Sequence, residues 1–236
     1  MTRISVLIGC YGSWPQYSLR AVDSVLAHCA RRDAFDLYVG CNESSSDIVT
    51  ALRGYVDQNR IEALVESRRN MNKDPMMRVL LEMCETEYAL WMDDDSQVLP
   101  GWDEHIIRFI DANRPFDVGG HIYFIHRTPE LTAFVRARPW YRGEEFERDP
   151  IWFATGGLFL ARVEWLKKHQ FPDRAMLKKQ DDVLLGELIC QQGGIIRDFA
   201  KDRGVMDRIK INDGKRRGTG EGDDGWLIAG TSRQSR

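Results

Sequence analysis

The stretch Tyr88-Ala-Leu-Trp-Met-Asp-Asp-Asp95 decides the fold, because an apolar run ends there in three consecutive aspartates. A short apolar run bounded by polar residues is typical of a buried strand. Three adjacent carboxylates repel one another and destabilise the fold unless a cation or hydrogen-bond donors offset their charge. The stretch therefore predicts a buried strand and, at its end, a site for positive charge.

The chain around this run alternates between strand and helix patterns. Apolar runs at residues 4–10, 35–41 and 61–65 are each followed by a segment with helical spacing of apolar side chains, the last from about Pro75. This alternation is typical of an α/β fold with a mostly parallel central sheet and helices on both faces. We expect one domain over residues 1–200, with halves at 1–100 and 101–200, the second smaller, and a flexible tail or lid over 201–236.

Polar residues follow three of the predicted strands. They are Gly12 and Ser13, then Asn42, and then the aspartates from Asp93 to Asp95. In open α/β sheets, ligands bind outside the carboxyl ends of the strands. We therefore expect these residues to lie at one binding edge.

Asp93 and Asp95 are the predicted metal ligands. They point to the same side if strand geometry continues through them. Two carboxylates in that arrangement suit Mg²⁺ or Mn²⁺, which prefer oxygen ligands and commonly bridge substrate phosphates. The alternative is a solvated acidic turn that caps a helix beginning near Trp102. The preceding strand and its place at the sheet edge favour the metal.

The composition is that of an ordinary globular protein: 236 residues, 43% hydrophobic, 29% charged and a net charge of −3. This acidity argues against a general nucleic-acid binder. The five cysteines are odd in number and form no CxxC pair, which indicates free thiols in a reducing compartment. The N-terminus has the pattern of a strand and no apolar run reaches membrane-spanning length, so we expect a cytoplasmic protein without a membrane span.

The order of several segments resembles the GT-A fold glycosyltransferases of family 2. The segments are Ile4-Ser-Val-Leu-Ile-Gly-Cys-Tyr11, Cys41-Asn-Glu-Ser-Ser-Ser-Asp47, Trp91-Met-Asp-Asp-Asp95, Ala154-Thr-Gly-Gly-Leu-Phe-Leu-Ala-Arg162 and Gln180-Asp-Asp-Val-Leu-Leu-Gly186. Their order is more specific than any one of them. The resemblance implies a GT-A (Rossmann-like) fold and metal-dependent sugar transfer from a nucleotide sugar, with a UDP-sugar favoured, to a hydroxyl acceptor.

The resemblance also implies roles for single residues. Asp95 would bind a divalent metal, Mn²⁺ or Mg²⁺, on the donor diphosphate, and Asp93 would reach the metal or the ribose. Asp182 would be the general base of an inverting transfer, and Gly12 and Ser13 would lie beside the nucleotide. The chemistry agrees, because such a transfer needs a carboxylate near the acceptor hydroxyl and a metal near the departing diphosphate.

Other positions are assigned less directly. Asn42 and Glu43 stand where the family usually has two aspartates, so Asn42 is a candidate nucleotide contact. Asp181 replaces a usual Glu, and Glu187 stands where a basic residue is common. Before the third helix, Asn70, Asn72, Lys73 and Arg78 could face a phosphate or form an ordinary polar loop.

The acceptor stays open at this stage: a small polar molecule, a lipid carrier, a protein, or a hydroxylated base in modified DNA. Trp140, Tyr141 and Arg142 could stack on a sugar or base, or pack inside a loop. The basic run from Lys215 to Arg217 could bind the diphosphate or be merely solvated. Two alternatives to glycosyl transfer are a nucleotidyltransferase of related fold and a non-catalytic nucleotide-sugar or glycan-binding protein.

Overall fold

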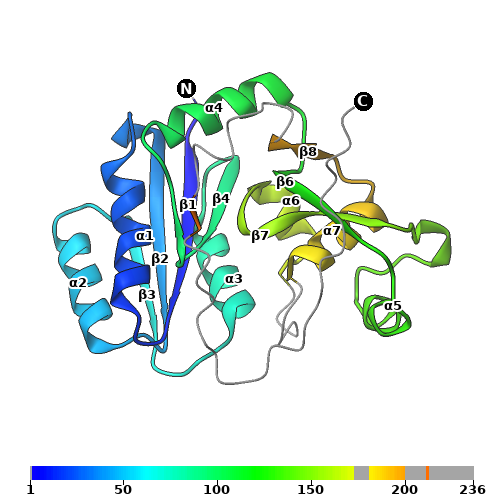
Figure 1. The fold of residues 1–236 in the computed structure, drawn as a ribbon, viewed down its shortest axis with the longest axis horizontal. Helices are drawn as coiled ribbons and strands as arrows, with labels where there is room; N and C mark the ends of the chain where they lie inside the picture. The colour runs from blue at the N-terminus through cyan, green and yellow to red at the C-terminus, as the bar shows by residue number, and fades with distance from the viewer. Residues whose placement is uncertain (1, 173–180, 200–210, 213–236) are drawn as a thin grey trace.

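The computed structural model describes residues 2–172, 181–199 and 211–212 (Figure 1). Its centre is a seven-stranded sheet in the order β3-β2-β1-β4-β7-β6-β8. The strands are β1 (Ile4–Tyr11), β2 (Phe35–Asn42), β3 (Ala63–Ser67), β4 (Tyr88–Asp93), β6 (Val118–Ile125), β7 (Ile151–Arg162) and β8 (Ile196–Asp198). Only β7 runs against the other strands of this sheet, since it pairs antiparallel with β4 and β6. The predicted mostly parallel α/β sheet is confirmed.

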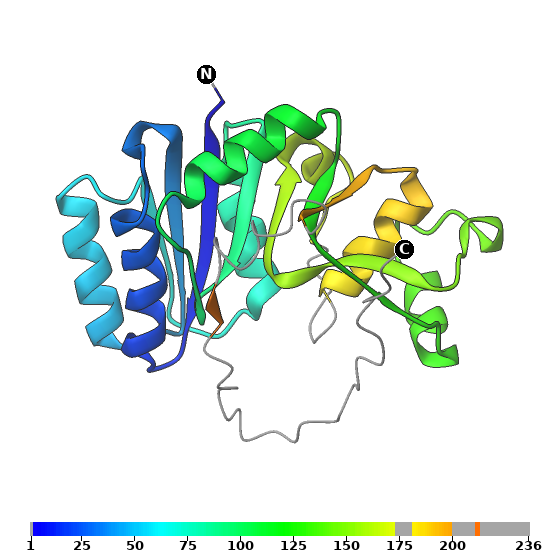
Figure 2. The same cartoon turned by 45° about the horizontal axis from the view of Figure 1, so that its top comes forward.

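Helices cover both faces of the sheet. They are α1 (Pro15–Ala27), α2 (Ser46–Asp57), α3 (Lys73–Met83), α4 (Trp102–Asn113), α5 (Pro129–Arg136), α6 (Val163–Lys168) and α7 (Asp181–Gln192), with 3-10 turns η1 (Arg32–Ala34) and η2 (Glu144–Phe146). One core layer joins the sheet to α1, α2 and α4, and the other joins it to α3, α5, α6 and α7. Figures 1 and 2 place α2 and α5 at opposite ends of the molecule.

Two glycines let helices lie directly against the sheet. A Cβ on Gly40 of β2 would lie 2.4 Å from Met76 Sδ of α3, and one on Gly186 of α7 would lie 2.4 Å from the Trp152 carbonyl oxygen of β7. Real Cβ atoms essentially never come that close. The contact at Gly186 is with backbone and needs glycine, whereas a side chain at position 40 would require the Met76 side chain to move. These two helices carry Lys73 and Asp181 at their first residues.

The structure differs from the sequence expectation in two places. Helix α6 was not predicted, because its 6 residues are too few to show a helical repeat of apolar side chains. The strand pattern of β4 ends at Asp93, and residues 94 and 95 form a turn before β5 (Ser96–Gln97). The alternation argument that aligned Asp93 with Asp95 is therefore wrong, since strand geometry does not continue past Asp93.

The chain returns to this turn near its end. Strand β9 (Ile211–Asn212) pairs antiparallel with β5, with Asn212 opposite Ser96. The basic run at residues 215–217 lies outside the described residues, and the division into halves and tail stays a prediction. Among the described helices, none is long and apolar enough to cross a membrane.

Candidate functional site

The carboxyl ends of the parallel strands bring the predicted segments to one edge. In the sheet register Gly9 of β1 lies between Gly40 of β2 and Asp93 of β4. The loops after these three strands therefore start side by side. This arrangement follows from the parallel pairing, as the sequence predicted.

The three aspartates have different environments. Asp94 is buried, and its Oδ2 accepts hydrogen bonds from the Tyr11 backbone N–H at 3.1 Å and from the Ser18 hydroxyl at 2.7 Å. Asp93 and Asp95 are partly exposed. Helix α4 has no side-chain cap at its N-terminus, so the alternative of an acidic turn capping that helix is not supported.

Lys73 joins the aspartate cluster to the second half of the chain. Its Nζ lies 2.8 Å from Asp93 Oδ1 and 2.9 Å from Asp181 Oδ2. Burial lowers the pKa of Lys73, but the charges of Asp181 and Asp93 outweigh burial and hold that pKa well above its ordinary value. Lys73 is therefore a cation at neutral pH, shared by carboxylates of β4 and α7.

Asp74 is a further carboxyl of this cluster, which the sequence pattern did not reveal. It is buried, and its Oδ1 has no hydrogen-bond partner among the described residues. Burial, and then the charge of Asp181, raise the pKa of Asp74 to about 8. Asp182 and Asp93 act in the same direction, whereas Lys73 opposes them. The charged groups of Lys73, Asp93, Asp181 and Asp182 therefore all lie close enough to Asp74 to act on it.

Helix α7 presents Asp181 and Asp182 in its first turn. Asp182 Oδ1 accepts a 2.8 Å hydrogen bond from the Val183 N–H. A helix N-terminus is a favourable position for negatively charged side chains. The predicted base thus directly follows Asp181, the residue of α7 that pairs with Lys73.

The first two loops at this edge are joined by hydrogen bonds. Gly12 has a positive φ of 69°, and its carbonyl accepts a 2.9 Å hydrogen bond from the Ser45 N–H. Ser44 donates its hydroxyl to the Cys10 carbonyl at 3.1 Å. Ser13 is exposed. The position of Gly12 and Ser13 next to the aspartate turn fits the predicted nucleotide contact, which stays a prediction.

Asn42 organises the third loop. It is buried, its Nδ2 donates to Asn70 Oδ1 and to the Asn72 carbonyl, both at 3.1 Å, and its Oδ1 accepts from the Met71 N–H at 2.8 Å. These contacts shape the loop that leads to Lys73. A nucleotide contact by Asn42 itself stays a prediction.

Arg78 lies on α3 with its side chain largely buried. Its guanidinium pairs with Glu82 one turn on and donates to the Phe171 carbonyl at 3.3 Å. The contacts described for Arg78 thus hold α3 to the chain that follows α6. The structure does not bring Arg78 into contact with the predicted aspartates, among the interactions described.

A buried polar ladder ties α7 to the segment between β6 and β7. Glu187 is fully buried and pairs with Arg127 at 2.5 Å. Gln191 donates to Glu187 Oε1 at 3.1 Å and accepts from the Arg142 N–H at 2.8 Å. The acidic residue where the family has a basic one is thus neutralised inside the fold by Arg127. These contacts hold the middle and the end of α7 against the segment between β6 and β7.

The aromatic residues of the second half divide between core and surface. Trp140 is buried in the core layer under α7, so packing, and not stacking on a ligand, is its role. Trp152 of β7 is 47% exposed, and its ring lies 5.2 Å from that of Phe124 on β6. The sequence does not reveal that Trp152 is exposed, because exposure depends on which face of the hairpin is covered.

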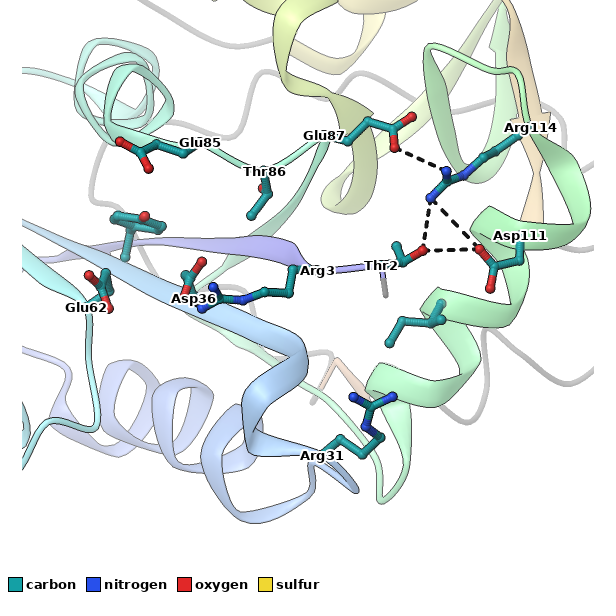
Figure 3. A pocket seen from close by; sticks show the side chains of 12 residues that line it. Thr2, Arg3, Arg31, Asp36, Glu62, Glu85, Thr86, Glu87, Asp111 and Arg114 are labelled. Carbon is teal, nitrogen blue, oxygen red and sulfur yellow. Dashed lines mark hydrogen bonds and ion pairs between the residues drawn. The ribbon is translucent and has the colours of Figure 1, made fainter.

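A cavity of about 890 Å³ lies at the opposite edge, around the amino ends of β1, β2 and β4 (Figure 3). Several of its charged side chains pair with one another. Arg114 Nη1 lies 3.2 Å from Glu87 Oε2, and Arg3 pairs with Asp36. The predicted site residues do not line this cavity.

The carboxylates at the candidate site fit a divalent metal shared with a substrate. Within the described ranges, no group of three or more His, Cys, Asp or Glu residues is arranged to hold a metal alone. Asp93 and Asp95 supply two hard oxygen donors at a partly exposed edge. Mg²⁺ is usually held in this way, by one or two carboxylates plus phosphates and waters.

Residues 5–170 match the family model described as glycosyl transferase family 2. The chain belongs to glycosyl transferase family 2. The match covers β1 to α6, and thus the loops of the candidate site and the aspartate turn. No curated protein matches the sequence.

Solved structures share the fold of this family 2 glycosyltransferase. It is similar to residues 1–349 of S. aureus TarS in complex with UDP, with a TM-score of 0.60 and 15% identity over 84% of this chain and 58% of that one. The UDP-GlcNAc complex of the same protein has a TM-score of 0.60 and 16% identity, over 92% of this chain and 60% of that one. The mannosyltransferase PcManGT from Pyrobaculum calidifontis, in complex with GDP-Man and Mn²⁺, has a TM-score of 0.58 and 16% identity, over 83% of this chain and 54% of that one.

These likenesses confirm the GT-A fold expected from the sequence. The chain spans less than two thirds of the length of each of these structures. Nucleotide sugars are bound in two of the three, and a nucleoside diphosphate in the other. At this level of identity, the likeness to these structures shows the fold alone.

Proposed function

We propose that this protein is a metal-dependent glycosyltransferase that moves a sugar from a nucleotide sugar to a hydroxyl acceptor with inversion, and that UDP-sugars are its favoured donors. One observation carries the proposal. Lys73 contacts both Asp93 at the end of β4 and Asp181 in the first turn of α7. A donor-side carboxylate and the helix of the candidate base therefore meet at one cation, as a transfer between two substrates requires.

In this proposal each residue has one task. Asp93 and Asp95 would hold a divalent ion, Mn²⁺ or Mg²⁺, which supplies charge stabilisation for the departing diphosphate. The loop of Gly12 and Ser13 would receive the nucleoside, next to the loop shaped by Asn42. Asp182 would take the proton of the acceptor hydroxyl while the hydroxyl oxygen attacks the anomeric carbon and the diphosphate departs.

The acceptor surface is proposed to include the β6–β7 hairpin. The exposed ring of Trp152 lies there beside the half-buried ring of Phe124, and aromatic faces bind sugars and bases well. Hydroxylated DNA bases stay among the acceptors to be tested. We also propose a cytoplasmic location, because all five cysteines are free, as in a reducing compartment.

The test is a donor screen with Mn²⁺ that records release of nucleoside diphosphate from UDP-, GDP-, ADP- and CMP-linked sugars, the last read as the monophosphate. We expect release from one donor class with the wild type and loss of release in Asp95→Ala. Release that continues unchanged in Asp95→Ala would show that the aspartate turn is not the donor site.

A further inference from the structure

Lys73 lies where it would repel a metal ion bound by Asp93. Its ammonium lies 2.8 Å from Asp93 Oδ1, the carboxylate that the proposed function gives to the metal. A divalent ion bound by the same carboxylate would lie about 2–2.6 Å from its oxygen. The ion and the ammonium would then be only a few ångströms apart. Two cations at that separation repel each other, more strongly at a partly buried site than in water.

A diphosphate changes the balance at this position. Its negative oxygens attract the metal ion and the ammonium together, so the repulsion between the two cations is offset. A lysine ammonium carries three donors on a flexible stem and can turn from a carboxylate to a phosphate oxygen. Lys73 stands at the first residue of α3, after the loop held by Asn42, so its backbone position is set independently of the ion.

The second contact of Lys73 widens this effect. Nζ also lies 2.9 Å from Asp181 Oδ2, at the start of α7. Any movement of the ammonium toward a phosphate therefore changes the charge next to the acceptor helix. Asp182, the neighbouring residue, is the candidate base.

We propose that Lys73 is a positioning residue that makes metal binding at Asp93 depend on the diphosphate. It weakens binding of the free divalent ion and strengthens binding of the ion together with a diphosphate. The inference rests on the proposed function and deepens it, since it sets the order in which metal and donor enter. Opposite signs for the two ligands distinguish this role from a merely structural one.

The experiment compares Lys73→Met with the wild type, using Mn²⁺ alone and Mn²⁺ with inorganic pyrophosphate. Free Mn²⁺ is measured by electron paramagnetic resonance, and folding by circular dichroism and thermal melts. We expect Lys73→Met to bind Mn²⁺ alone at least about fivefold more tightly, because a repelling charge is gone. Binding of Mn²⁺ with pyrophosphate should weaken, by about fivefold or more on the same Coulomb scale.

Two control variants separate charge from other effects. Lys73→Arg keeps the charge and should resemble the wild type with both probes. Lys168→Met removes an ammonium from the last residue of α6. Helix α6 follows Arg162, which pairs with Tyr88 at the first residue of β4, whereas Asp93 is the last residue of that strand. That variant should bind both probes as the wild type does.

Asp95→Asn makes the possible failures distinguishable. If Asp95→Asn weakens Mn²⁺ binding but Lys73→Met leaves it unchanged, the inference about Lys73 is overturned and the proposed metal site stands. If Lys73→Met weakens both probes, Lys73 only supports the local fold and the inference is also overturned. If Asp95→Asn does not affect binding of Mn²⁺ with pyrophosphate, or the wild type binds no Mn²⁺ even with pyrophosphate, the proposed metal site itself is wrong.

Discussion

The Ser18 hydroxyl donates a 2.7 Å hydrogen bond to Asp94 Oδ2, which ties the middle residue of the aspartate triplet to helix α1. Both side chains are buried. Asp93, one residue earlier, instead pairs with Lys73. Three identical residues in a row thus divide between support of the fold and the candidate site, and this division can be tested by substitution.

Asp94→Ala should destabilise the protein. The change leaves the buried Ser18 hydroxyl and the Tyr11 N–H without their acceptor, which should cost about 1–3 kcal/mol of unfolding free energy. Urea denaturation measures the loss. Ser18→Ala is the matched control: it removes one donor, leaves the Tyr11 contact, and should cost less. A stability equal to the wild type in Asp94→Ala would contradict the supporting role.

Asp95→Ala should have the opposite profile. Its side chain is partly exposed, so we expect a change in unfolding free energy within about 0.5 kcal/mol. Donor turnover should fall by about 10²-fold or more, because charge on the departing diphosphate loses its stabilisation. Release of nucleoside diphosphate with Mn²⁺ measures this. Full activity of the wild type in excess EDTA would count against the metal.

Asp182→Asn should reduce turnover by about 10²- to 10⁴-fold, the usual contribution of a general base. An asparagine oxygen can still accept the hydrogen bond from the Val183 N–H, so the first turn of α7 should persist. Calorimetry with metal and donor should show nearly unchanged donor binding. Equal losses in binding and turnover would assign Asp182 to the donor site or to the fold.

Asp74 should make stability depend on pH. Burial first, and then Asp181, raise the pKa of Asp74 from its ordinary 3.8 to about 8. Between these values the folded protein holds a proton that the unfolded chain has released, so the unfolding free energy falls as pH rises from about 4 to about 8. The charges that act on Asp74 come from its own helix (Lys73), from β4 (Asp93) and from α7 (Asp181, Asp182).

The measurement is urea denaturation of metal-free protein at pH 6 and pH 8.5. Asp74→Asn should lose part of the decline between these two conditions and should be stabilised most at the higher pH. Asp57→Asn removes an exposed carboxyl at the end of α2 and is the matched control. The same decline in Asp74→Asn as in the wild type would show that Asp74 is not the group responsible.

The basic run from Lys215 to Arg217 should bind the donor. It lies outside the described residues, but Asn212, paired with Ser96 beside the aspartate turn, precedes it by three residues, so the chain can reach the site. Replacing Lys215, Arg216 and Arg217 by glutamine should raise the donor KM, more at low salt than at high salt. Steady-state kinetics at two ionic strengths measure this. An unchanged KM at low salt would leave the run a solubilising end.

The sequence by itself determined the alternation from β1 to β4 and the edge at which the polar loops meet. Apolar spacing is a local property of the chain, and parallel strands in right-handed crossovers bring their carboxyl ends together without further information. The position of Asp93 beside the loop of Gly12 followed from these two facts. The family resemblance, and the fold it implied, came separately from the order of the sequence segments that carry it.

Only the tertiary structure decided how residues far apart in sequence meet. Strand β7 lies between β4 and β6 and runs against both, an order that depends on long-range pairing. The contact of Lys73 with Asp181 and the burial of Asp74 follow from how α3 and α7 pack, with Gly186 allowing the close approach of α7 to β7. Apolar spacing carries no record of such contacts, because burial and charge pairing are set by neighbours that the chain supplies from elsewhere.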